Sequence, residues 1–179
     1  MAAPLPWMQR KWTFTYAVGF HPDIIERLRG VPARIEDLTR SWPAEVLIRR
    51  SGETWSIQEN IGHLLDLEGL LDARIDDFLA GRDVLRAADM TNRATHEAGF
   101  NSRPITGLLA DLRRERVRLV SRLDALAESD FARTALHPRL QTPMRLLDAC
   151  QFAADHDDYH IARMVELARL FGAMANPRR

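Results

Sequence analysis

The stretch that decides the fold is TWSIQENIGHLLDLEGLLDARIDDFLAG, residues 54–81. Ser56 and Glu59 have the spacing of a capping box, in which each side chain accepts a hydrogen bond from the other residue's backbone N–H at a helix start. Apolar residues then recur on one helical face, namely Ile57, Ile61, Leu64, Leu71, Ile75 and Phe78. The segment is therefore predicted to form a long helix with one buried face, ending at Gly81.

Two further helical regions have similar start and stop signals. Pro22 suits a first helical turn and opens an apolar stripe that pauses at Gly30 and restarts at Pro32, which predicts one interrupted helix. Ser102 and Pro104 introduce the next region, whose leucines recur at helical spacing. Both regions are therefore predicted to be helical.

Thr142 and Pro143 are predicted to cap and open the last long helix, which Gly172 stops. Residues 82–101 and 128–141 show no sustained period and are predicted to be connections, and no segment has a competing strand pattern. The predicted fold class is therefore all-α, a four-helix bundle. The interior of such a bundle is a common place for metal sites built from facing helices.

Length and composition set broad limits on the kind of protein. With 179 residues the chain is predicted to be a single domain, residues 1–179: an aromatic N-terminal arm (1–21), the bundle (22–172) and a tail (173–179). Its 25 cationic side chains balance 25 anionic ones. A balanced chain gives little electrostatic reason to bind nucleic acid or anionic lipid, so neither partner is expected.

Cys150 is the only cysteine, so no intramolecular disulfide can form, and its side chain is predicted to lie in the core. The N-terminus has no apolar stretch long enough for a signal-peptide core or a membrane span. A cytoplasmic location without membrane anchoring is therefore expected.

The helix that contains His156 and His160 carries the main chemical signal. Residues at i and i+4 project from one face, and here that face is otherwise apolar, so both imidazoles are predicted to point inward and could bind one cation. The alternative is that they bond to buried acids or water. The run HDDYH is not the zinc-protease motif, because Asp157 stands where that motif needs glutamate.

A third ligand must come from another helix, and His63 is the only histidine in the other long helices. It lies at the edge of the apolar stripe, from which its side chain could reach across the bundle. The alternative is a half-exposed histidine bonded to Glu59 or Asp66.

Several other residues are assigned structural roles. Glu68 lies in the apolar stripe and is predicted to have a buried arginine partner. Arg163 is predicted to pair with an acid on a neighbouring helix, although it could also meet an anionic ligand. His96 and His137 are predicted to lie in turns or at the surface, and Trp55 near an arm or dimer contact.

Five stretches of the chain together resemble a known family. They are TWSIQENIGHLLDLE (54–68), RTALHPRLQTPMRLL (133–147), DHDDYHIARM (155–164), KWTFTY (11–16) and IERLRGVPARIEDL (25–38). They resemble the DinB superfamily of metal-binding four-helix bundles. The most specific part is a tryptophan-serine helix start followed by a histidine, with an H-x3-H pair farther along the chain.

The resemblance implies an up-down-down-up bundle that forms a homodimer. It also implies that His63, His156 and His160 bind one divalent ion, zinc or nickel in the first place. Three protein ligands leave positions for water or substrate, as expected of a catalytic metal. Imidazole ligands suit several metals, so the ion's identity stays open.

Members of the superfamily with an assigned activity include thiol-dependent transferases and an isomerase. The resemblance therefore implies a metal-dependent enzyme that activates a low-molecular-weight thiol, or water, for attack on a small electrophilic substrate. Asp157 and Tyr159, beside the histidine pair, are candidate catalytic residues, against the alternative of solvated or interhelical hydrogen bonding. The alternative functions are a non-catalytic metal-binding or stress-response protein, and a domain with vestigial histidines that acts through its dimer surface.

Overall fold

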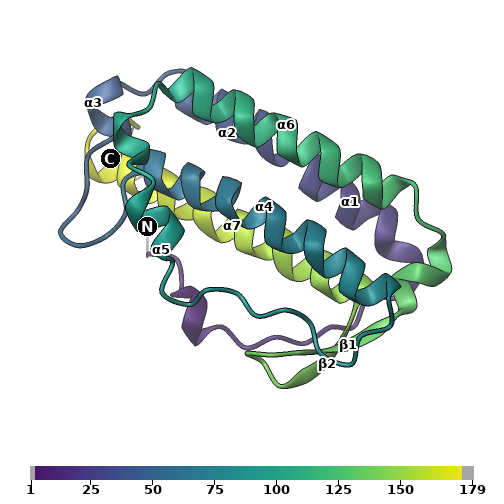
Figure 1. Cartoon of the computed structure of the whole chain (residues 1–179). Helices are drawn as coiled ribbons and strands as arrows, with labels where there is room; N and C mark the ends of the chain where they lie inside the picture. The colour runs from purple at the N-terminus through teal and green to yellow at the C-terminus, as the bar shows by residue number, and fades with distance from the viewer. Residues whose placement is uncertain (1–2, 175–179) are drawn as a thin grey trace.

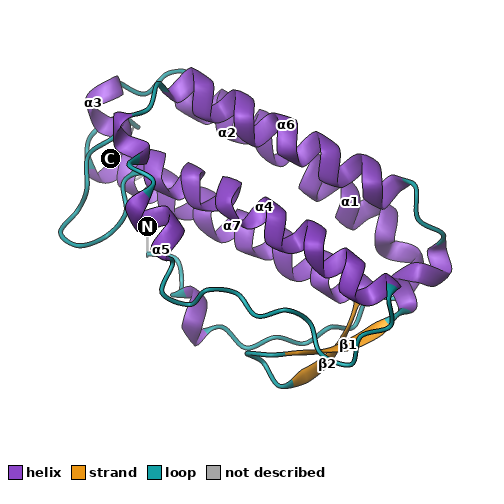
Figure 2. Ribbon diagram, viewed as in Figure 1, coloured by secondary structure: helices purple, strands orange, loops and turns teal. Residues whose placement is uncertain are grey.

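The structure, a computed structural model, describes residues 3–174. Its α-helices are α1 (His21–Arg29), α2 (Val31–Thr39), α3 (Ala44–Leu47), α4 (Ile57–Leu79), α5 (Arg93–Glu97), α6 (Ile105–Asp124) and α7 (Leu146–Leu170). Its strands are β1 (Thr134–His137) and β2 (Thr142–Arg145). Short 3-10 turns lie at Trp7–Gln9, Val18–Phe20, Phe100–Ser102 and Glu128–Ala132. The long elements are all helices (Figure 2).

Four long helical segments form a bundle in the predicted up-down-down-up order: α1 together with α2, then α4, α6 and α7. Figure 1 shows α1 and α2 continuing one another along the bundle, α4 running in the opposite direction, α6 running in the same direction as α4, and α7 reversing again. α4 packs on α6 and α7 and lies diagonally across the bundle from α1. Two parallel neighbours need a long connection, which is the segment 80–104 between α4 and α6. Gly30 keeps helical φ and ψ between α1 and α2, which confirms the interrupted first helix.

The capping box at the start of α4 is confirmed. The side-chain hydroxyl of Ser56 accepts a hydrogen bond from the Glu59 N–H at 3.1 Å, and the Glu59 carboxylate accepts one from the Ser56 N–H at 2.8 Å. These bonds satisfy two backbone N–H groups that a helix start otherwise leaves unpaired. They fix where α4 begins, and hence the direction in which His63 projects.

A buried polar layer divides the core into two apolar clusters. Its centre is Arg116 of α6, which donates hydrogen bonds to Glu68 at 2.8 Å and to Asp157 at 2.7 Å. All three side chains are buried. The predicted arginine partner of Glu68 is therefore confirmed, and the layer joins α4, α6 and α7 at one level of the bundle.

The prediction that no strands form is wrong. β1 and β2 pair antiparallel in a short hairpin, with Leu136 opposite Pro143, just before α7. Strands of four residues are too short to show an alternating pattern, and a strand edge tolerates proline because its missing N–H faces no partner. Thr142 and Pro143 therefore belong to β2 and do not cap α7, which begins at Leu146.

Two other local predictions are also corrected. Ser102 does not cap α6: Pro104 directly precedes this helix, and no side chain caps it. The connection 82–101 is not wholly irregular, because it contains α5. Its backbone also bonds to the hairpin, with the Leu85 N–H donating to the Leu136 carbonyl at 3.0 Å.

The N-terminal arm, as far as it is described, packs against α7. In Figure 1 the arm (purple) and the connection after α4 (teal) run along the side of the bundle formed by α4 and α7. The rings of Trp7 and Trp12 each lie 4.9 Å from that of Phe152.

Of the predicted arm and tail, residues 1–2 and 175–179 lie outside the described residues. Within residues 3–174, no helix has the length and apolarity that crossing a bilayer requires.

Candidate metal centre

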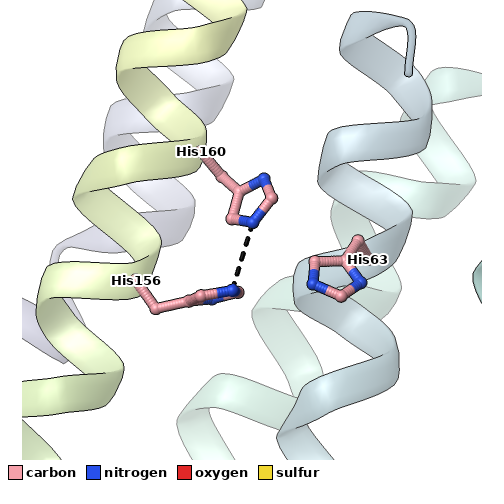
Figure 3. A group of neighbouring side chains, drawn as sticks. All are labelled: His63, His156 and His160. Atoms are coloured by element: carbon pink, nitrogen blue, oxygen red, sulfur yellow. Dashed lines mark hydrogen bonds between the residues drawn. The ribbon is translucent and has the colours of Figure 1, made fainter. Parts of the chain in front are cut away.

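The three predicted histidines come together in the interior of the bundle. Figure 3 shows His63 on α4 facing His156 and His160 on α7. One ring nitrogen from each lies within 4.8 Å of the others. His63 and His160 are each 5% exposed, and His156 is half-buried. The half-exposed alternative for His63 is wrong, and the capping Glu59 is not its partner.

A hydrogen bond that His160 donates to Asn60 fixes the orientation of the His160 ring. The His160 Nδ1 lies 2.8 Å from the Asn60 Oδ1, and the Asn60 amide nitrogen donates to the Ser56 carbonyl at 2.7 Å. Because the amide oxygen can only accept, Nδ1 of His160 carries the proton. Its Nε2 therefore keeps a lone pair, and this atom faces His156.

A relay through α5 fixes His63 in the same way. Its Nδ1 lies 3.1 Å from the Thr95 hydroxyl oxygen, and that hydroxyl donates its proton to Asp66 at 2.7 Å. The hydroxyl oxygen thus accepts from Nδ1–H of His63, which leaves the lone pair on Nε2. Histidines that bind a metal typically donate their other ring N–H to an oxygen acceptor in this way, and here that acceptor is itself bonded to a carboxylate.

The spacing within the α7 pair suits two ligands of one ion. The Nε2 atoms of His156 and His160 are 3.1 Å apart. Two nitrogens that each bind a tetrahedral ion at about 2.0–2.1 Å lie about 3.3 Å from each other. The α7 pair therefore already has the spacing of two ligands of one ion, and a ring nitrogen of His63 lies within 4.8 Å of both.

Burial keeps these imidazoles neutral, the form that binds metals. It lowers the pKa of His63 from 6.5 to about 4, with a further contribution from His96. It lowers the pKa of His156 to about 3, aided by the neighbouring His63 and by arginines, and holds the pKa of His160 well below its usual value. At neutral pH the cluster offers lone pairs without having to lose protons.

The two candidate catalytic residues occupy different surroundings. The Tyr159 ring lies 5.0 Å from that of His160, and the guanidinium of Arg10 lies 4.9 Å above the tyrosine ring. The Asp157 carboxylate instead bonds to Arg116 in the polar layer. Tyr159 is thus beside the candidate metal centre, and Asp157 can affect it only through its neighbours.

The assignments of His137 and Arg163 need correction, and the contacts of Trp55 can be given. His137 is neither exposed nor in a turn: it ends β1, is 3% exposed and accepts the Leu140 N–H at its Nδ1. Trp55 packs on the histidines, 4.6 Å from the His63 ring. Arg163 pairs with Glu166 of its own helix and not with an acid on a neighbouring one.

Cys150 is fully buried in the core, as predicted, and burial raises its pKa to about 12. A thiol in that state is not a nucleophile at neutral pH. Any thiol that reacts at the histidine cluster must therefore be brought by a ligand.

The histidine cluster lies in the wall of a large cavity. The cavity has a volume of about 1110 Å³ and extends along α4 and α7 beneath the arm and the segment 87–92. Residues 137–139 of the hairpin line its other end. Such a space is large enough for a small organic substrate next to the metal ligands.

Asn60 and Thr95 are the site residues that sequence reasoning missed. Asn60 stands three positions before His63, on the same helical face, so its spacing alone could have placed it beside the candidate metal ligands. Thr95 lies in the aperiodic segment 82–101, where no pattern distinguishes it. Only the folded connection brings it to His63.

Comparison with known proteins agrees with this fold. A solved structure described as "YfiT from Bacillus subtilis is a probable metal-dependent hydrolase with an unusual four-helix bundle topology" superposes with a TM-score of 0.79 at 22% sequence identity. The match covers 91% of this chain and 94% of that one. None of the curated proteins matches the sequence significantly. The family model of the DinB superfamily matches residues 27–164. The chain therefore belongs to the DinB superfamily.

Proposed function

We propose that the protein is a metal-dependent enzyme in which His63, His156 and His160 hold one divalent ion, zinc or nickel in the first place. The observation that carries this proposal is the convergence of three neutral imidazoles on one point. Hydrogen bonds to Asn60 and Thr95 hold the Nε2 lone pairs of two of them toward it.

A divalent ion held by the three imidazoles would lower the pKa of a bound thiol or water and so supply a nucleophile at neutral pH. The chain's own residues shape the space around that nucleophile. Trp7 and Trp55 pack against His156 and His63 and give this space apolar walls. Tyr159, beside His160, is our candidate proton donor, and Asp157 our candidate positioning residue through Arg116.

We propose a low-molecular-weight thiol as the nucleophile and a small electrophile as the substrate. The second candidate is hydrolysis, in which water takes the place of the thiol. It is favoured by the description of YfiT, a protein of the same fold, as a probable metal-dependent hydrolase. A non-catalytic metal-binding role is the remaining alternative.

Turnover assays with matched variants separate these functions. The protein, loaded with zinc or nickel, is incubated with an aryl halide and several thiols, and separately with carboxylic esters. Metal-dependent thioether formation supports transfer, and metal-dependent ester cleavage supports hydrolysis. Either activity should be lost in His63→Ala and kept in His21→Ala, because His21 on α1 neither lines this cavity nor belongs to the ligand group. Bound metal without turnover of any substrate would contradict the enzyme proposal.

We also propose, from family membership, that the protein is a cytoplasmic homodimer. Sedimentation velocity should give a species of about twice the 20.5 kDa chain mass. A single species at the chain mass would overturn the dimer.

A further inference from the structure

The end of the cavity beside the hairpin contains basic groups without acidic partners. They are Arg74 of α4, His137 at the end of β1 and Arg139 in the hairpin turn, and all three line the cavity. Arg74 is 8% exposed and His137 is 3% exposed, while Arg139 is half-buried. Buried cations are ordinarily paired, so this cluster needs an explanation.

Arg74 makes no ion pair with any acid among the described residues. Its Nε donates to the carbonyl oxygen of Arg86 at 3.1 Å. The acid that acts on it most, Asp77, is already bonded to the Arg86 side chain at 2.8 and 2.9 Å. Burial lowers the pKa of Arg74 to about 10, and repulsion from Arg139 and Arg86 adds to this effect. A bound anion would therefore offset the cost of burying this unpaired positive charge.

His137 and Arg139 each present a donor without an acceptor. The His137 Nδ1 accepts the Leu140 N–H at 3.2 Å, so the neutral ring carries its proton on Nε2. That Nε2 and the Nη2 of Arg139 are both shielded from solvent and have no hydrogen-bond partner among the described residues. Leaving a buried donor unsatisfied is costly, so an acceptor is missing from this end of the cavity.

The other two arginines that line the cavity do not share this feature. Arg116 is bonded to Glu68 and Asp157 in the polar layer, and Arg163 pairs with Glu166. The lack of partners is thus confined to the end of the cavity beside the hairpin.

Aromatic rings connect this end of the cavity to the candidate metal centre. The Phe152 ring lies 5.3 Å from the His137 ring and 4.9 Å from the Trp7 ring, which lies 4.8 Å from that of His156. Phe152 precedes His156 by four residues on α7, or about 6 Å along the helix axis. A small molecule with a flat apolar body can therefore contact both ends at once.

We propose that Arg74, His137 and Arg139 form an oxyanion subsite, which binds a carboxylate or phosphate group of the substrate. The inference rests on the proposed function and deepens it, because it names the substrate class: a small anionic molecule. Its apolar body packs on Phe152 and Trp7, and its reacting group faces the three histidines. Guanidinium groups bind carboxylate and phosphate with paired, charge-assisted hydrogen bonds.

Three probes that share a benzene ring test the subsite: benzoate, phenyl phosphate and benzamide. Their binding is measured by titration calorimetry on metal-free protein, in which no ion can attract the anions. At least one anion should bind about tenfold or more tightly than the neutral amide, since a charge-assisted pair contributes more than a neutral one. The tighter of the two anions identifies the anion class. Equal binding of the three probes, or no binding at all, would overturn the subsite.

Arg139→Gln is the variant of choice, because Arg139 is less buried than Arg74 and makes no ion pair among the described residues. It should remove the preference for the anion, whereas Arg163→Gln, a change at a paired arginine of the same cavity, should keep it. Unchanged preference in Arg139→Gln would contradict the proposal. The comparison of probes on the wild-type protein needs no variant and stands if Arg139→Gln fails to fold.

The two proposals fail in different ways. If the metal-free protein prefers the anions but never binds a divalent ion, the subsite stands and the metal enzyme falls. If the protein binds the ion through its histidines but does not distinguish benzoate and phenyl phosphate from benzamide, only the subsite is wrong.

Discussion

Nδ1 of His160 on α7 lies 2.8 Å from Oδ1 of Asn60 on α4, so one helix orients a candidate metal ligand carried by another. The amide nitrogen of Asn60 is itself bonded to the carbonyl of Ser56, the N-cap residue of α4. The position of the imidazole is thereby tied to the capped start of α4. Metal affinity should depend on this bond although Asn60 is not among the proposed ligands.

Replacing Asn60 by leucine removes the acceptor for the His160 Nδ1–H. We expect affinity for zinc to fall about 10- to 100-fold, the usual effect of losing a hydrogen-bond partner of a metal-binding histidine. Asn60→Asp keeps an oxygen acceptor and should retain most of the affinity. Competition with a chromophoric chelator measures both variants, and equal affinities would contradict the positioning role.

The metal-free protein should become less stable as the pH falls from about 7 to about 5, in part because of His63. Burial lowers the pKa of His63 from 6.5 to about 4. Between these values the unfolded chain binds a proton that the folded chain does not. Acid therefore favours unfolding, by up to about 1.4 kcal/mol per pH unit for this residue.

The test compares urea unfolding of the wild type and His63→Gln at several pH values. Burial also raises the pKa of Glu68, which contributes to the pH dependence with the opposite sign, so only the difference between the two proteins isolates His63. The variant should show a smaller loss of stability in acid than the wild type does. Parallel pH profiles for wild type and His63→Gln would contradict the pKa assignment.

Two glycines of α4 should respond in opposite directions to alanine. A Cβ at Gly62 would overlap the ring of Phe100, whereas a Cβ at Gly69 would meet no atom within 4 Å. Gly62→Ala should lower the free energy of unfolding by about 1–3 kcal/mol through overpacking. Gly69→Ala should raise it by about 0.5–1 kcal/mol, because alanine favours a helix interior. Chemical denaturation measures both, and the same sign for the two would refute the packing.

The polar layer should be costly to disrupt. Arg116→Leu leaves the Glu68 and Asp157 carboxylates buried without their cation and should lower the free energy of unfolding by about 3–5 kcal/mol. Arg118→Leu, on the same helix, removes an exposed pair with Asp72 and should cost less than about 1 kcal/mol. Comparable losses in the two variants would show that the layer contributes no more than a surface ion pair.

Sequence periodicity predicted the long elements because each buries one continuous apolar face. The capping box of Ser56 and Glu59 placed the start of α4 correctly, and helix spacing predicted that His156 and His160 project together. The hairpin escaped prediction because four-residue strands, one of which contains Pro143, leave no alternating pattern. β1 also contacts a segment far away in the chain, through the hydrogen bond from the Leu85 N–H to the Leu136 carbonyl.

The surroundings of the histidines were less predictable than the histidines themselves. Thr95 reaches His63 because the connection after α4 folds back over the bundle, and His137 is buried because the hairpin packs on α7 at Phe152. Neither event follows from local pattern. The homodimer remains a prediction from the family, since exposed residues carry no pattern that identifies a partner surface.

Elemental analysis of dialysed, tag-free protein, beside His160→Ala, tests the central claim most directly. Both proteins are first equilibrated with zinc or nickel. The account predicts about one ion per chain in the wild type, as one three-histidine site requires, and none in the variant. A wild type that retains no ion, or a variant that retains as much as the wild type, would contradict a metal centre at His63, His156 and His160.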